Sequence, residues 1–267
     1  MKIEIANFIF EFKSKQNRML GILEKRYNNF AIKAKAEFSF EVNFLKKSSL
    51  PFRPSIIFKE KKWIISRGDF YCALDMKNKK GLLEISPRVQ SFDSFLRVLC
   101  SWLLINNNGF ILHAAAILKN GKGYVFPGKS GAGKSTISKM FQRTEKGRKG
   151  EGNNLLLTDE LIPVRIEKDK IKIYGSPFWG EMKNKGKRIP GGIKLEKLFF
   201  LKKSKTNVVS KIGKGEFYKR ILRCIMNFSK EKNDFLKIFK AISRVYLKTE
   251  ISDLKFSNRD DSFFNII

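Results

Sequence analysis

Cysteine and histidine are scarce in this chain. Its three cysteines, Cys72, Cys100 and Cys224, are far apart and form no C-x-x-C pair. This spacing supports neither a disulfide scaffold nor a zinc site, so we expect reduced, buried thiols in a cytoplasmic protein. The single histidine, His113, excludes a metal site built from several imidazoles.

The sequence also lacks a long uninterrupted apolar run. The uncharged stretch Val98–Leu118 carries three asparagines and a glycine, at 106–109, in its middle. A membrane-spanning helix tolerates such residues least at its centre. Glu4 and Glu11 interrupt the apolar amino terminus, so a signal peptide is not predicted either. We therefore predict a soluble chain without a membrane span.

Acidic residues are few: 25 Asp and Glu stand against 55 Lys and Arg, which gives a net charge of +30. The excess is mostly lysine and is spread along the chain, whereas nucleic-acid binders tend to cluster Arg and Lys on one stripe. We expect an anionic partner such as a nucleotide, but no clear nucleic-acid site. With 267 residues, 42% of them hydrophobic, the chain can build one or two ordered domains.

The amino-terminal third is rich in predicted strands. Residues 30–44 alternate apolar and polar side chains, the period of a long half-buried strand. Four shorter apolar runs follow between turn-forming residues, at 56–58, 63–65, 70–74 and 82–85. The sequence predicts a β-rich, antiparallel amino-terminal unit over residues 1–91, without residues that suggest chemistry.

From residue 92 the pattern becomes mixed, and we predict a second domain over 92–267. Apolar residues at helical spacing predict a helix from Phe92 to Asn108. The turn Asn120-Gly121 joins predicted strands at 111–118 and 123–127. Residues 142–154 are polar and predict a surface loop. Further elements are predicted as strands at 155–157, 162–166, 171–174 and 198–201, and as helices at 217–226 and 235–246.

One segment dominates the chemistry, because residues 128–135 fit the phosphate-loop pattern G-x-x-x-x-G-K-[ST]. In such a loop the glycines let backbone N–H groups surround a phosphate, the lysine reaches the β- and γ-phosphates, and the hydroxyl contacts Mg²⁺. An apolar strand precedes the loop and a helix follows, as this function requires. The predicted ATP-binding residues are Gly128, Lys129, Ser130, Gly131, Ala132, Gly133, Lys134, Ser135 and Thr136.

Two further elements complete the predicted site. Asp159 and Glu160 end a short apolar strand, where their carboxylates suit metal binding and proton transfer, although a solvated acid pair is the simpler interpretation. His113 lies one hairpin upstream of the loop. Strand pairing across that hairpin would bring its ring near Asp159 or an attacking hydroxyl, whereas a lone histidine on an apolar strand is more often a core residue.

These residues together resemble a known family. The runs LHAAAILKNGKGYVFPGKSGAGKST, LLLTDELIPVRI and GSPFWG are similar to the HPr kinase and PEP-carboxykinase-like superfamily, and more narrowly to small HPr-kinase-related proteins of bacterial biosynthetic clusters. The resemblance covers about a third of the chain, from Phe110 to Leu201. It implies an α/β fold: a PEP-carboxykinase-like P-loop kinase core, with a mixed sheet and flanking helices, beside the β-rich amino-terminal unit.

The resemblance also implies roles for single residues. Asp159 matches the family's base toward a serine hydroxyl, and His113 the histidine that assists it. Lys134, Ser135 and Thr136 match the contacts to ATP and Mg²⁺. Glu160 stands where the family usually has a second Asp, as a metal ligand. Arg188 is a weaker match to an arginine near the transferred phosphate.

The sequence therefore predicts a Mg-ATP-dependent kinase of a hydroxyl, on a serine of a small protein or peptide or on a free metabolite. The catalytic residues would be Asp159, His113 and Lys134, and the metal ligands Ser135 and Glu160. An ATP-binding regulator or assembly factor with little chemistry stays open, because Glu160 and the segment around Arg188 depart from the family pattern. A nucleic-acid-binding ATPase would rest on charge alone.

Overall fold

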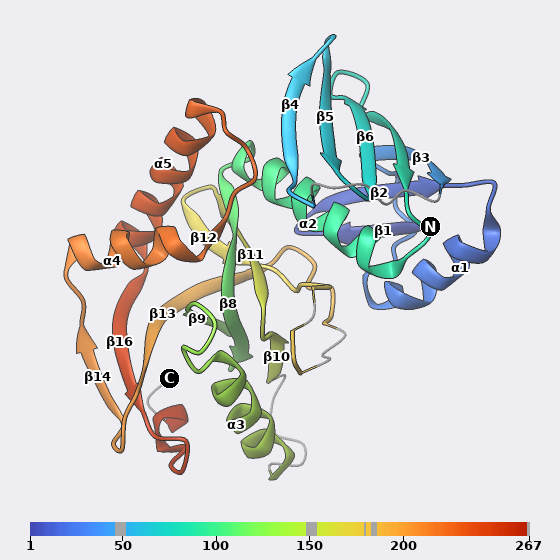
Figure 1. The fold of residues 1–267 in the computed structure, drawn as a ribbon. Helices are drawn as coiled ribbons and strands as arrows, with labels where there is room; N and C mark the ends of the chain where they lie inside the picture. Colours follow the sequence, from blue (N-terminus) through green and yellow to red (C-terminus); the bar gives the residue numbers. More distant parts are fainter. Residues whose placement is uncertain (46–51, 148–153, 179, 183–185, 266–267) are drawn as a thin grey trace. The chain divides into compact units, whose positions relative to one another are not determined.

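The chain is a mixed α/β protein with two mixed β-sheets, of seven and nine strands, and five α-helices in the described part of the chain (Figure 1). This computed structural model describes residues 1–45, 52–147, 154–178, 180–182 and 186–265. The chain divides into two compact units. The first comprises Met1–Leu103 with Asn227–Asp234, and the second Leu104–Met226 with Phe235–Ile267. The sequence predicts a domain boundary before residue 92 instead, and that domain division stays a prediction.

The first unit contains the seven-stranded sheet, in the order β1-β2-β3-β7-β6-β5-β4. Its strands are β1 (Lys2–Ile5), β2 (Phe8–Lys13), β3 (Phe38–Phe44), β4 (Ser55–Lys59), β5 (Lys62–Arg67), β6 (Phe70–Asp75) and β7 (Lys80–Ile85). Its helical elements are α1 (Asn17–Arg26), the 3₁₀ turn η1 (Asn28–Phe30) and most of α2 (Val89–Ile105).

The prediction of a wholly antiparallel unit was wrong. Strand β3 pairs in parallel with both β2 and β7, while the other neighbours in the sheet are antiparallel. Helix α1 lies in the connection between β2 and β3, and such a crossover lets two strands run in the same direction. The strands β1 and β2 were not predicted at all.

The predicted long strand over residues 30–44 was also wrong in its first half. Only Phe38–Phe44 is a strand, and Phe30 ends the 3₁₀ turn. Between them Lys33, Ala34 and Lys35 are exposed. Alanine buries little apolar area, so alternation alone did not hold this segment on a sheet.

Aromatic packing joins α2 to the seven-stranded sheet. The Phe92 ring lies 4.9 Å from Phe12, and Phe95 lies 5.9 Å from Phe40 and 5.7 Å from Phe70, measured between ring centroids. Phe12 and Phe40 stack on neighbouring strands at 5.1 Å. This layer of phenylalanine rings is the core of the first unit.

The second unit contains the nine-stranded sheet, with the path β10-β8-β11-β12-β13-β16-β14 and with β9 and β15 paired beside it. Its strands are β8 (Gly109–Lys119), β9 (Lys122–Pro127), β10 (Leu155–Thr158), β11 (Leu161–Glu167), β12 (Lys170–Ile173), β13 (Ile193–Lys203), β14 (Val208–Lys211), β15 (Ile225–Met226) and β16 (Glu250–Phe256). Its helical elements are α3 (Lys134–Gly147), α4 (Lys214–Ile221), η2 (Leu222–Cys224), most of α5 (Lys232–Lys248) and η3 (Ser262–Asn265).

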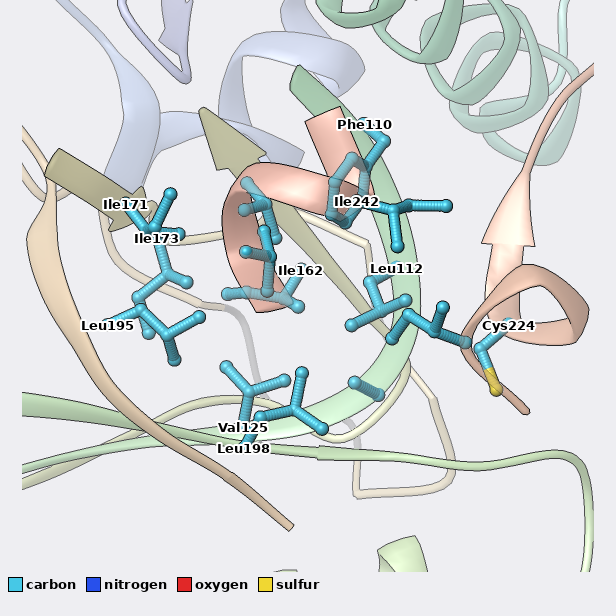
Figure 2. Packing of buried hydrophobic residues seen from close by; sticks show 14 of the residues in the cluster. Phe110, Leu112, Val125, Ile162, Ile171, Ile173, Leu195, Leu198, Cys224 and Ile242 are labelled. Carbon is cyan, nitrogen blue, oxygen red and sulfur yellow. The ribbon is translucent and has the colours of Figure 1, made fainter. Parts of the chain in front are cut away.

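Strand β8 separates two cores in this unit. Ala114 and Ala116 join one cluster with residues of β11, β12, β13 and α5, part of which Figure 2 shows. Ala115 and Ile117 join a second cluster with residues of α3 and η3. Both sides of β8 are therefore buried, which explains its nearly continuous apolar sequence.

Most elements predicted for this region are confirmed, including the β8–β9 and β11–β12 hairpins and the helix at 235–246. The predicted helix over 217–226 was wrong at its end, because Ile225–Met226 form strand β15, which pairs with β8. The predicted loop over 142–154 was wrong at its start, because α3 continues to Gly147; residues 148–153 lie outside the described residues. Strands β14 and β16 were not predicted. In the described part of the chain, no helix has the length and apolarity that crossing a membrane requires.

Replacing Phe40 with alanine should destabilise the protein by about 3–5 kcal/mol, because this fully buried ring contacts rings on both β2 and α2. Urea unfolding followed by circular dichroism measures the loss. Phe58→Ala is the matched control: Phe58 is 59% exposed, and its removal should cost less than about 1 kcal/mol. Equal losses in the two variants would contradict this account of the core.

Candidate functional site

The predicted phosphate loop connects β9 to α3, as its sequence context required. Gly131 and Gly133 have φ values of 82° and 107°, in the region that favours glycine. A side chain at Gly133 would also place its Cβ 2.7 Å from the Phe256 ring. Two of the loop's glycines are thus required by backbone conformation and, at Gly133, by packing.

Lys134 starts α3 and turns its side chain back under the loop. Its Nζ donates hydrogen bonds to the carbonyl oxygens of Gly128 (2.9 Å) and Lys129 (3.1 Å). Only 8% of the residue is exposed, and this burial lowers the pKa of the ammonium group, while acidic groups that include Asp159 and Glu160 act in the opposite direction. The ammonium is held where the loop backbone converges.

Strand β8 places His113 between the loop and the acidic pair. On one side the backbone N–H of Gly128 donates to the carbonyl of His113 at 3.2 Å. On the other side His113 is opposite Leu161, and the next N–H of β8 donates to the carbonyl of Glu160 at 2.9 Å. The half-buried His113 side chain therefore projects from the strand that is hydrogen-bonded both to the phosphate loop and to the acidic segment.

Asp159 and Glu160 occupy a break between β10 and β11, which both pair with β8. The Thr158 hydroxyl accepts the N–H groups of Glu160 (3.0 Å) and Leu161 (3.2 Å) across this break. Such a side-chain turn redirects the backbone without leaving its donors unpaired. At this bend Asp159 and Glu160 leave the strand pairing and line the same cavity as the phosphate loop.

The Asp159 carboxylate is held by backbone donors on both oxygens. The N–H of Gly180 donates to Oδ1 at 3.1 Å, and that of Met182 to Oδ2 at 2.9 Å. Asp159 is only 4% exposed. A Cβ on Gly180 would lie 2.6 Å from Oδ2, so the close approach of the two segments requires glycine at this position. The orientation of Asp159 is thus set by the segment that follows Phe178.

These residues line one cavity of about 320 Å³ within the second unit. Its lining residues include loop glycines, two lysines, three hydroxyl residues, a histidine and three acidic residues. The lining residues are His113, Ser130, Gly131, Gly133, Lys134, Ser135, Thr136, Asp159, Glu160, Gly180, Glu181 and Lys203. Donors for phosphate oxygens and acceptors for a proton or a cation thus face the same space.

The other predicted residues lie elsewhere. Gly128, Lys129 and Ala132 line a second, smaller cavity beside the loop. Arg188 is half-buried and lies outside the described walls of both cavities, and its role stays a prediction.

Sequence reasoning did not select Glu181 or Lys203 as site residues. Glu181 directly follows the run GSPFWG, which could have drawn attention to it. Lys203 is one lysine among many at the end of β13, and nothing in the sequence distinguishes it. Only the pairing of distant strands brings Lys203 to the cavity.

Comparisons with protein-family models and with curated proteins found no match for this chain.

Removing the Asp159 carboxylate should release the two backbone N–H groups that donate hydrogen bonds to it. In Asp159→Ala we expect hydrogen exchange at Gly180 and Met182 to accelerate about tenfold or more, because hydrogen bonds to charged groups are the stronger ones. Asp159→Asn keeps one acceptor oxygen and should protect one of the two amides. Amide-resolved NMR exchange makes the measurement. Unchanged exchange at both amides in Asp159→Ala would show that the carboxylate does not hold this segment.

Proposed function

We propose that this protein is a Mg-ATP-dependent kinase that transfers the γ-phosphate to a hydroxyl group, most simply of a serine in a small protein, a peptide or a free metabolite. The proposal is supported by one observation above all: the phosphate loop, His113 and the acidic pair line the same cavity. It also includes the finer fold, an HPr-kinase and PEP-carboxykinase-like core in the second unit.

The loop would hold the ATP phosphates. Gly131 and Gly133 line the cavity, where their backbone N–H groups would meet phosphate oxygens. Lys134 would exchange its loop carbonyls for phosphate oxygens. An ammonium held at the loop would stabilise the charge that shifts toward the β–γ bridging oxygen during transfer. These residues would position the triphosphate without forming a covalent bond to it.

The oxygen donors fit a magnesium ion. The Ser135 hydroxyl and the Glu160 carboxylate line the same cavity, and Mg²⁺ prefers one or two protein oxygens together with phosphates and water. When bound, Mg²⁺ would neutralise phosphate charge. Ser135 and Glu160 are the residues that would hold it.

Asp159 would accept the proton of the attacking hydroxyl. The acceptor oxygen forms a bond to the γ-phosphorus, the bond from that phosphorus to the bridging oxygen breaks, and ADP leaves. The amides of Gly180 and Met182 orient the carboxylate and leave further lone pairs on each oxygen. His113, on the neighbouring strand, would tune the proton transfer.

One observation favours the second candidate, a nucleotide-binding regulator with little catalysis. Both oxygens of Asp159 already accept backbone hydrogen bonds, an arrangement that also suits a purely structural acid. Such a protein would bind ATP through the same loop and release no product. The two candidates therefore differ in phosphate transfer and agree on ATP binding.

The decisive assay incubates the protein with Mg²⁺, γ-labelled ATP and a size-fractionated extract of the host. We expect Lys134→Ala to lower transfer about 10²–10³-fold through lost charge stabilisation. Asp159→Asn should lower it about 10²–10⁴-fold and keep ATP binding. Lys139→Ala is the matched control, since this exposed lysine of α3 lies outside the described cavity wall.

Mass spectrometry of the labelled fractions identifies the acceptor. ATP binding without labelled product in any fraction would favour the regulator. Full turnover in Asp159→Asn would remove the assigned base.

ATP binding should also take up a proton at alkaline pH. Burial lowers the pKa of free Lys134, and phosphate charge beside it would raise that pKa again. Because the pKa of free Lys134 lies below the ordinary lysine value of about 10.4, part of the free lysine is neutral at alkaline pH and must be protonated on binding. Affinity therefore falls as pH rises. Calorimetry in buffers of different ionisation enthalpy measures the uptake, which Lys134→Ala should abolish.

A further inference from the structure

A second cavity, of about 190 Å³, lies beside the phosphate loop and has a different chemical character. It shares no lining residue with the first cavity, and all of its walls belong to the second unit. The lining residues are Pro127, Gly128, Lys129, Ala132, Phe200, Leu201, Arg220, Arg223 and Cys224. Three of these side chains are cationic, and none of the described lining residues is acidic.

Arg220 is held in place by its neighbours. Its Nη1 lies 2.5 Å from Oδ1 of Asp253, and its guanidinium carbon lies 4.3 Å from the centre of the Phe200 ring. The other carboxylate oxygen of Asp253 pairs with Lys202 at 2.7 Å. With only 19% of its side chain exposed, Arg220 is a preorganised cation rather than a mobile surface charge.

Arg220 and Arg223 are three residues apart, where α4 ends and η2 follows. Lys129 comes from the loop, so cations from two distant segments converge on one small space. The single carboxylate that holds Arg220, Asp253, is shared with Lys202 and does not line the cavity. The charge of the cavity is therefore positive.

The cavity floor is apolar and neutral. Cys224 belongs to the buried hydrophobic cluster that Figure 2 shows in part. Burial raises the pKa of its thiol, against the charges of Lys134, Arg220 and Lys129. The thiol therefore stays protonated at neutral pH and does not neutralise the cations. No described lining residue of this cavity therefore carries a negative charge.

We propose that this cavity is a second anion site, which binds an oxyanion, a phosphate or carboxylate group, of a small ligand. Planar guanidinium groups match the geometry of both oxyanions, and a volume of about 190 Å³ admits such a group together with part of its carrier. The site lies at the first residues of the loop, so its occupant would contact the protein next to the bound nucleotide. It goes beyond the proposed kinase function and does not depend on it.

The test titrates inorganic phosphate, and separately acetate, into protein whose loop is saturated with Mg²⁺ and a non-hydrolysable ATP analogue, at constant ionic strength. We expect one phosphate to bind per chain. In Arg223→Gln the dissociation constant should rise about tenfold or more. Lys219→Gln is the matched control. It removes one positive charge from α4, the helix directly before η2, outside the described cavity wall, and it should leave the affinity unchanged.

Phosphate binding without acetate binding identifies a phosphate site, and binding of both identifies a general oxyanion site. The proposal is overturned if the ATP analogue abolishes all phosphate binding, or if Lys219→Gln weakens binding as much as Arg223→Gln. If the analogue itself does not bind, the kinase proposal fails. In that case phosphate is titrated into Lys134→Ala protein without nucleotide, and Arg223→Gln and Lys219→Gln are each compared in that background. A loss of phosphate affinity in Arg223→Gln alone would still support the second site.

Discussion

The backbone pairing of β8 is the constraint on which the candidate site depends. This strand pairs with β9 on one edge and with β10 and β11 on the other, and a short pairing with β15 continues along it. Because β9 leads into the phosphate loop and the acidic pair lies between β10 and β11, β8 sets the distance between them. The side chains of its consecutive alanines point alternately into the two cores, so a register shift of one residue would move each of them to the opposite core.

Polar groups on the site side are positioned by backbone hydrogen bonds more than by ion pairs. Loop carbonyls hold Lys134, the Thr158 hydroxyl bends the chain at the acids, and two amides hold Asp159. Such bonds orient a side chain directionally, and in buried surroundings salt screens them little. This matters in a chain of net charge +30, where long-range electrostatics attracts any anion and local geometry has to select one.

Sequence patterns were most informative where a segment carries its own constraint. The phosphate loop needs glycines and a lysine at given spacing, so its start, its end and the flanking strand and helix could be predicted. The hairpin at Asn120-Gly121 could be predicted because these residues adopt positive φ at little cost. The alternation over 30–44 misled, because alternating alanines and lysines imitate a strand without the apolar area that holds one on a sheet.

The sequence by itself determined the chemistry that is available: a phosphate loop, two adjacent acids and a single histidine, each recognisable from local spacing. Only the tertiary structure decided which side chains meet. The parallel pairing of β13 with β9 and β16 brings Lys203 to the cavity, and α4 and η2 each bring one arginine to the second cavity beside the loop. These pairings join residues far apart in sequence, and they depend on the burial of whole sheet faces, which no local pattern contains.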